Sequence, residues 1–153
     1  MTYRVRRVLP GDSELVHGML TLFSQAFEDP ESYDSKRPSQ QYLDRLLAGD
    51  SFVALVAVEG DAVVGAIAAY ELRKFEQERS EIYIYDLAVS EQQRRQGIAT
   101  ALIDGLRAIA AERGAYVVYV QADYGDDPAI ALYTKLGTRE DVMHFDIPVP
   151  AKA

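Results

Sequence analysis

The sequence contains no cysteine, which excludes disulfide bonds, thiol nucleophiles and thiolate metal sites. Histidine is nearly as scarce, and His17 and His144 lie too far apart in sequence to suggest a zinc site, so no metal is expected. No apolar run is long enough to span a bilayer, and the N-terminal stretch MTYRVRRVLPGDSE lacks the apolar core of a signal peptide. We therefore expect a cytoplasmic protein with no membrane partner.

A basic surface is missing as well. The net charge is −8, and the only basic clusters are the short stretches RVRR and QQRRQG, so a nucleic-acid partner is not expected. An acidic protein can favour a cationic substrate through its long-range field. The same charge can also serve only to keep the protein soluble.

The chain has 153 residues, of which 48% are hydrophobic and 26% charged, and this predicts one globular α/β domain spanning residues 1–153. The hydrophobic pattern predicts strands at 3–9, in a hairpin that turns at Gly60-Asp61, at 81–89, at 115–123 and at 142–149. Helices are predicted from Asp12 or Ser13 to Phe27, between Ser39 and Gly49, from Ile98 to Gly114, and from a cap at Asp127 to Gly137.

The residues from Glu81 to Asp123 form a predicted strand, crossover helix and strand. Such a unit usually makes a parallel pair with a right-handed crossover, and the hairpin before it makes the sheet mixed. Ligands of open α/β sheets bind beyond the carboxyl ends of the strands. These ends are predicted at Val89 and Asp123.

The stretch SEQQRRQGIATALI places Arg94 and Arg95 just before a helix, where the unpaired N–H groups already carry partial positive charge. A bound anion would explain the two cations, and Gly97 would let a phosphate approach the backbone closely. The stretch matches neither the Walker nor the Rossmann pattern. The alternative is that the arginines are simply solvated and Gly97 is a turn residue.

The pattern Arg94-x-x-Gly97-x-Ala99 matches the [QR]-x-x-G-x-[GA] motif of the GCN5-related N-acetyltransferases, and DLAV and ALYTKLG fit that family in order and spacing. Two longer blocks, KFEQERSEIYIYDLAVSEQQRRQGIATALI and GAYVVYVQADYGDDPAIALYTKLG, resemble the type I aminoglycoside 3-N-acetyltransferases (gentamicin acetyltransferases). The resemblance begins near Ala26. It implies a single-domain GNAT fold, the acyl-CoA N-acyltransferase fold, with a mixed central sheet flanked by helices.

The resemblance also implies that acetyl-CoA is the acetyl donor. Main-chain groups of Leu87, Ala88 and Val89 would hold its pantetheine arm, in a slot between two splayed strands. Tyr133 would give a proton to the departing thiolate, although its helical position equally suits a core tyrosine. The pyrophosphate would bind the turn, mostly through backbone N–H groups of Arg94, Arg95, Gln96, Gly97, Ile98, Ala99 and Thr100.

The implied acceptor is a small cationic aminoglycoside, which suits the acidic stretch QADYGDD. That stretch supplies Asp123, Asp126 and Asp127, although Asp127 can serve only as a helix cap, and Asp126 replaces an asparagine common among relatives. Glu81 and Asp123 are the predicted candidates for the general base. Tyr83 and Tyr85 share a strand face with Glu81 by alternation and would shape the pocket, unless they only pack in the core. Further predicted substrate contacts are Asp29 and Asp146, and His144 is predicted to be structural.

The expected reaction is direct acetyl transfer, in a ternary complex, to the 3-amino group of the 2-deoxystreptamine ring of a gentamicin-like aminoglycoside, conferring resistance. The family is often dimeric, so a homodimer is compatible with the resemblance. One alternative is an acetyltransferase acting on another amine, such as a polyamine or a protein amino group. A different class is a non-catalytic CoA-binding module, since a fold does not fix a function.

Overall fold

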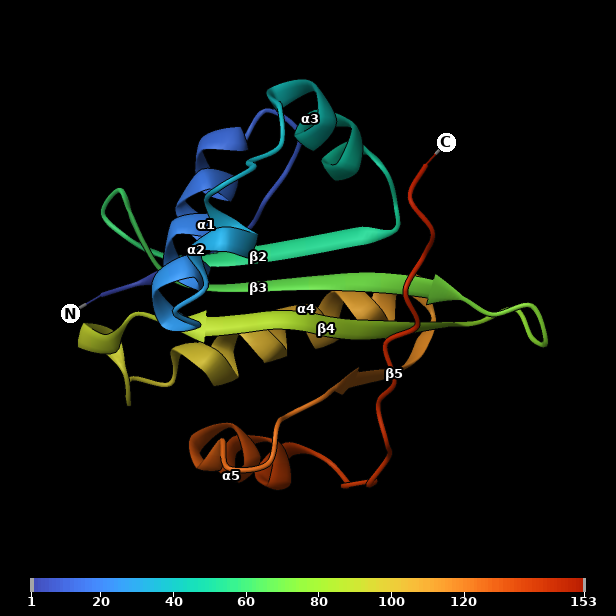
Figure 1. Cartoon of the computed structure of the whole chain (residues 1–153). Coiled ribbons are helices and arrows are strands. Elements are labelled where there is room, and N and C mark those ends of the chain that lie inside the picture. The colour runs from blue at the N-terminus through green and yellow to red at the C-terminus, as the bar shows by residue number, and fades with distance from the viewer. Residues whose placement is uncertain (1, 153) are drawn as a thin grey trace. The chain divides into compact units, whose positions relative to one another are not determined.

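The computed structural model describes residues 2–152 and has a five-stranded mixed sheet flanked by helices (Figure 1). The strand order is β1-β2-β3-β4-β5; neighbours from β1 to β4 are antiparallel, and β4 and β5 are parallel. The elements, in chain order, are β1 (Arg4–Arg7), α1 (Ser13–Ala26), α2 (Pro30–Tyr33), α3 (Gln40–Ala48), β2 (Phe52–Glu59), β3 (Ala62–Arg73), β4 (Ser80–Val89), the 3-10 turn η1 (Glu91–Gln93), α4 (Ile98–Arg113), β5 (Ala115–Val120) and α5 (Asp127–Leu136).

The sheet has a helical layer on each face (Figure 1). Helices α1 and α3 pack through Met19, Phe23 and Leu43 onto one face, where they bury the small side chains of Ala66 and Ala68. Helix α4 covers the opposite face with an apolar stripe that includes Ile98, Leu102 and Leu106, all almost completely buried. The predicted hairpin, the parallel β4–β5 pair and its crossover helix α4 are confirmed.

Gly65 fixes how closely the start of α4 approaches the sheet. A Cβ at this position of β3 would lie 2.6 Å from Ile98 Cγ2, which is closer than atoms can pack, and in a tight contact of 3.3 Å with Leu102 Cδ1. Ile98 is the first residue of α4, so the missing side chain lets the helix N-terminus sit directly against β3, next to the end of β4.

The chain divides into two compact units, residues 1–121 and 122–153. The second contains α5, whose cap is Asp126, one residue earlier than predicted, because the Asp126 carboxylate accepts the N–H of Ala129. The predicted strand at 142–149 is wrong: these residues form no ladder with any described residue. Their apolar alternation suits a strand, but a strand needs a pairing partner, and Pro148 removes one donor.

No helix among residues 2–152 is long and apolar enough to cross a membrane.

Candidate active site

The turn between β4 and α4 has an irregular backbone. Arg95 has φ +65° and Gly97 has φ +77°, so both residues lie in the left-handed region. Space is not the constraint at Gly97, since a Cβ there would come no closer than 4.0 Å to the Tyr3 hydroxyl. Glycine is favoured at this position because of its backbone conformation.

The first turn of α4 lacks the usual means of satisfying its N–H groups. Gly97 is the N-cap residue and offers no side-chain acceptor, and the first turn contains no acidic residue. Arg94 and Arg95 are exposed beside it. Free N–H groups, the helix dipole and two cations together suit a pyrophosphate, so the residues present fit the CoA moiety.

The last part of β4 has a free edge. The parallel ladder with β5 joins Ser80–Ile84 to Ala115–Val120 and stops there, while β4 continues to Val89. On its other edge, Leu87, Ala88 and Val89 pair with β3. Their main-chain groups facing the β5 side therefore have no strand partner among residues 2–121, as a slot between splayed strands requires.

A β-bulge decides which side chains reach the α1 face of β4. Ala68 of β3 pairs with Asp86, but Ala69 pairs with Ile84, so Tyr85 is an extra residue without a partner. Asp86 therefore lies on the same face as Tyr83, whereas strict alternation would place it on the opposite face. The bulge sets an acidic side chain on this face three residues before the end of the strand.

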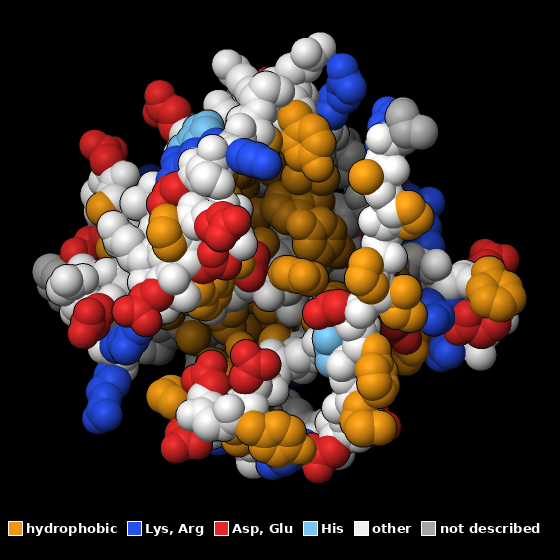
Figure 2. All heavy atoms as spheres, viewed as in Figure 1, with side chains coloured by type: hydrophobic (Ala, Val, Ile, Leu, Met, Phe, Trp, Pro, Cys, Tyr) orange, Lys and Arg blue, Asp and Glu red, His pale blue; other side chains and the backbone are white. Residues whose placement is uncertain are grey.

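Four tyrosines line the α1 face beyond the helices, and we call them the tyrosine face: Tyr70, Tyr83, Tyr85 and Tyr119. The rings of Tyr83 and Tyr119 stack with centroids 4.7 Å apart, and Tyr85 meets Tyr83 and Tyr70 edge-on at 5.5 and 6.0 Å. Figure 2 shows the apolar floor of this side of the sheet, with acidic side chains beside it in the region of α1 and α2. Aromatic rings next to carboxylates suit a cationic, ring-shaped ligand.

Asp86 is a partly buried carboxylate with a single hydrogen-bond partner among the described residues. Tyr33 of α2 donates its hydroxyl to Asp86 Oδ1 at 2.7 Å. No described Lys or Arg forms an ion pair with Asp86. Burial raises the pKa of Asp86, and the Tyr33 hydrogen bond offsets part of that rise. A carboxylate held this way attracts a cation and accepts a proton more readily than an exposed one.

Glu81, a predicted general base, lies at the opposite end of β4. It precedes Val89 by eight residues, about 26 Å along an extended strand, whereas Asp86 is about 10 Å from that residue. The Tyr116 hydroxyl donates to Glu81, and Lys74 Nζ lies 4.0 Å away. Glu81 therefore already has partners of its own, far from the phosphate turn.

Asp29 and Tyr83, two further predicted substrate contacts, belong to the α1 side. Asp29 is the N-cap of α2, where its carboxylate accepts the Ser32 N–H at 3.1 Å, so a short helix forms in a segment for which the sequence predicts neither helix nor strand. The Tyr83 hydroxyl donates to Gln121 Oε1 at 3.0 Å.

The remaining predicted site residues lie in the unit formed by residues 122–152. Strand β5 ends at Val120, so Asp123 lies in the turn after it and not in the strand as predicted; its carbonyl accepts the Asp126 N–H.

Burial and the charge of Asp126 raise the pKa of Tyr133, which keeps its hydroxyl protonated at neutral pH. Asp126 caps α5, Asp127 is its first residue, and Asp146 lies 2.8 Å from His144 Nε2.

Four residues of this site were not predicted from sequence: Tyr33, Tyr70, Asp86 and Tyr119. Tyr70 and Tyr119 could have been found from alternation, because each pairs with Tyr83 across a ladder. Asp86 and Tyr33 carry no such signal, since one depends on the bulge and the other on a short helix in a polar segment.

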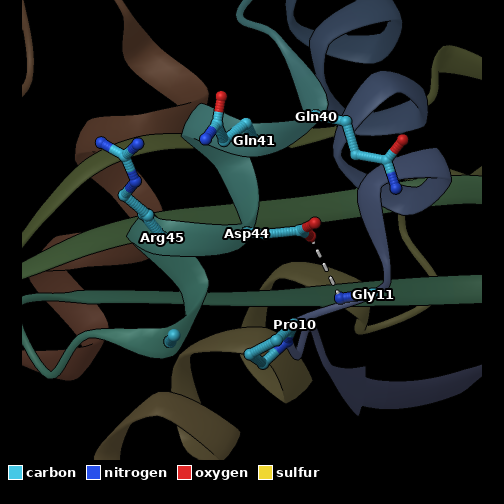
Figure 3. A pocket seen from close by; sticks show the side chains of 7 residues that line it. Pro10, Gly11, Gln40, Gln41, Asp44 and Arg45 are labelled. Carbon is cyan, nitrogen blue, oxygen red and sulfur yellow. Dashed lines mark hydrogen bonds between the residues drawn. The ribbon is translucent and has the colours of Figure 1, made fainter.

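A shallow depression of about 750 Å³ lies elsewhere in the first unit, between the segment after β1 and helix α3 (Figure 3). Pro10, Gly11, Gln41 and Arg45 are among its lining residues, and Asp44 accepts the Gly11 N–H at 3.3 Å. It contains neither the tyrosine face nor Asp86. Within residues 2–152, no group of three or more His, Cys, Asp or Glu side chains is placed to hold a metal ion.

Comparisons with solved structures cover nearly the whole chain. An aminoglycoside acetyltransferase from an uncultured soil metagenomic sample is 55% identical, over 98% of this chain and 100% of that chain, with a TM-score of 0.95. A second aminoglycoside acetyltransferase from such a sample, in complex with sisomicin, is 30% identical over 97% of each chain, with a TM-score of 0.88.

Curated relatives match over a shorter region. N-acetyltransferase 8B of Rattus norvegicus is 31% identical over 90 residues, which are 59% of this chain and 40% of the relative. The chain thus spans about two fifths of the length of such relatives. The sequence profile of the Acetyltransferase (GNAT) family matches residues 16–138, in agreement with the turn, the free strand edge and the sheet order. The chain belongs to the GNAT family of acetyltransferases, which use acetyl-CoA.

Proposed function

We propose that the chain acts as one domain, in the cytoplasm, and transfers the acetyl group of acetyl-CoA to an aminoglycoside. The proposed acceptor atom is the 3-amino nitrogen of the 2-deoxystreptamine ring of a gentamicin-like compound. The observation that carries the proposal is the partly buried Asp86 carboxylate, which has no cationic partner among the described residues. It lies beside the tyrosine face, near the end of the strand that precedes the phosphate turn. The two aminoglycoside acetyltransferases of similar structure support the same substrate class.

On the donor side, the turn and the free edge of β4 would hold acetyl-CoA. Backbone N–H groups of Gly97, Ile98, Ala99 and Thr100 would bind the pyrophosphate, with Arg94, Arg95 and Gln96 adding contacts from the turn. Leu87, Ala88 and Val89 would bind the pantetheine arm through main-chain groups. When bound, acetyl-CoA supplies an activated thioester.

On the acceptor side, Asp86 would receive one ammonium group of the substrate and take a proton from it, directly or through water. The freed lone pair then forms the bond from nitrogen to the acetyl carbon as the carbon–sulfur bond breaks, and the nitrogen loses its second proton to water as the neutral amide forms. The Tyr133 hydroxyl would give its proton to the leaving sulfur and regain one from water. Without a cysteine to carry an acetyl group, the transfer is direct.

Other carboxylates would hold the remaining ammonium groups of a polycation. Asp29 lies on α2 in the same unit as Asp86, and Asp123, Asp126, Asp127 and Asp146 keep their predicted role as substrate contacts. Glu81 lies far from the end of β4 and already has Tyr116 and Lys74 as partners, and both facts support Asp86 over Glu81 as the base. Tyr83 and Tyr85 would stack against the sugar rings.

Acetylation removes a positive charge and reduces the number of hydrogen-bond donors on the antibiotic, so the antibiotic binds ribosomal RNA more weakly and resistance follows.

The test of the proposed function measures the release of thiol from acetyl-CoA with and without gentamicin, followed by mass spectrometry and NMR of the product. The proposal predicts gentamicin-dependent release and one acetyl group, on the 3-amino nitrogen. Release only with polyamines or protein amines would redirect the proposal to those acceptors. Acetyl-CoA binding without turnover on any amine would support a binding module instead.

A further inference from the structure

Two tyrosine hydroxyls each donate to a carboxylate of β4. Tyr33 donates to Asp86 Oδ1, and Tyr116 donates to Glu81. The second pair lies among cations, because the Arg79 guanidinium stacks 3.9 Å over the Tyr116 ring and Lys74 lies near Glu81. The first pair has no cation beside it among the described residues. The two tyrosine–carboxylate pairs are chemically alike, but only the Tyr116–Glu81 pair already has cationic side chains beside it.

Tyr33 is held firmly from three sides. Its ring packs against both Phe23 and Phe27, with centroids 5.8 and 5.7 Å away. The start of α2 is capped by Asp29, as described above. At its other end, Asp34 accepts hydrogen bonds from Ser24 of α1 and from Arg37, and Arg37 also donates to Thr21. The position of the Tyr33 hydroxyl is therefore set by α1 and α2, independently of Asp86.

A fixed donor on one carboxylate oxygen leaves the other oxygen in a defined direction. We infer that Tyr33 is a positioning residue for the proposed transfer: it holds Oδ1 of Asp86, so that Oδ2 meets the acceptor's ammonium group and takes its proton. The inference rests on the proposed function. It assigns to α2 a part in the proton transfer, although no residue of α2 touches the reacting atoms.

The surroundings of Asp86 define how its titration depends on Tyr33. The titratable groups close enough to interact with it are Tyr33 from α2, Tyr70 from β3 and Tyr83 from β4, and Asp29 and Tyr85 lie close to Tyr33. None of these groups is a cation. Because the Tyr33 hydrogen bond lowers the pKa of Asp86 against the effect of burial, its loss must raise that pKa.

The experiment compares Tyr33→Phe with Tyr116→Phe, since each variant keeps its ring and loses only the hydroxyl that serves a β4 carboxylate. The readout is the pH dependence of kcat/KM for gentamicin acetylation. For Tyr33→Phe we expect the acid limb to move to higher pH by about one unit, with KM for acetyl-CoA unchanged. For Tyr116→Phe we expect the wild-type profile. Ser24→Ala, which loosens the anchor of α2, should move the limb in the same direction by less.

Each contrary result has its own meaning. An unshifted Tyr33→Phe profile, with the limb lost in Asp86→Asn, would overturn the inference and leave the role of Asp86 intact. A shift in Tyr116→Phe alone would assign the base to Glu81 and overturn it as well. If the wild-type protein acetylates no aminoglycoside, the proposed function fails, and ¹³C NMR titration of the Asp86 carboxyl tests the hydrogen bond itself. An Asp86 pKa equal in wild type and Tyr33→Phe would then overturn the inference independently.

Discussion

The phosphate turn and the acceptor face are built in opposite ways. The turn is one continuous stretch, residues 90–100, and it would act mainly through backbone N–H groups set by left-handed residues and an uncapped helix. The acceptor face is made of side chains from α2, β3, β4 and β5, which are far apart in sequence and meet only after folding. One half is cationic and exposed, the other aromatic, acidic and partly buried. Variants should therefore impair the two halves separately.

The largest expected effect is on turnover. Asp86→Asn keeps the size of the side chain but removes the negative charge and the basic oxygen. We expect kcat/KM for the acceptor to fall by about 10²–10⁴-fold, which is the range for a general base, while KM for acetyl-CoA stays near the wild-type value. Steady-state kinetics with each substrate varied in turn measures both. A loss of less than about tenfold would remove Asp86 from the proton transfer.

The next effect concerns only the donor half. Replacing Arg94 and Arg95 together with alanine should weaken acetyl-CoA binding by roughly 10–100-fold, because two charge-assisted hydrogen bonds are lost. Arg107→Ala is the matched control, since this exposed arginine lies within α4, beyond the turn, and pairs with Asp104. Calorimetry of acetyl-CoA binding should separate the two variants. Equal affinities would show that the arginines are only solvated.

A smaller effect should follow from the bulge residue. Tyr85 is 64% exposed and its hydroxyl has no hydrogen-bond partner within residues 2–152, so its ring can stack against a cationic sugar. Tyr85→Leu should raise the acceptor KM by about three- to tenfold, whereas Tyr85→Phe, which keeps the ring, should leave it nearly unchanged. Equal rises in both variants would point to the hydroxyl instead of the ring.

The smallest expected effect is on stability: Asp86→Asn, which impairs turnover, should gain stability relative to wild type as the pH rises. Burial raises the pKa of Asp86 in the folded protein above its usual 3.8, so its ionisation favours the unfolded state. Its contribution to stability is complete below the unfolded pKa and is lost as the pH rises through the folded pKa. Asn does not titrate, so the Tm of Asp86→Asn should gain on wild type as the pH rises from 4 to 7. Thermal melts measure this effect, and a difference in Tm between Asp86→Asn and wild type that does not change with pH would contradict this account.

The same contrast explains how far the sequence could be interpreted. The hairpin, the parallel β4–β5 pair and the start of α4 at Ile98 follow from local periodicity, caps and glycines, and all were predicted. The bulge at Tyr85 has no signature in EIYIYDLAV, so alternation could not bring Asp86 to the acceptor face. Pairing between distant segments is equally hidden, which is why β5 ends before Asp123 and why 142–149, despite its pattern, forms no ladder.

The most direct test of the two-half account measures gentamicin binding by calorimetry in wild type, in Asp86→Asn and in the Arg94→Ala, Arg95→Ala double variant. The account predicts that Asp86→Asn loses about tenfold in gentamicin affinity, because one desolvated charge pair is removed, and keeps its affinity for acetyl-CoA. The double variant should lose affinity for acetyl-CoA and keep its affinity for gentamicin. Equal loss of both ligands in either variant, or wild-type gentamicin affinity in Asp86→Asn, would contradict the assignment of the acceptor half to Asp86 and the tyrosine face.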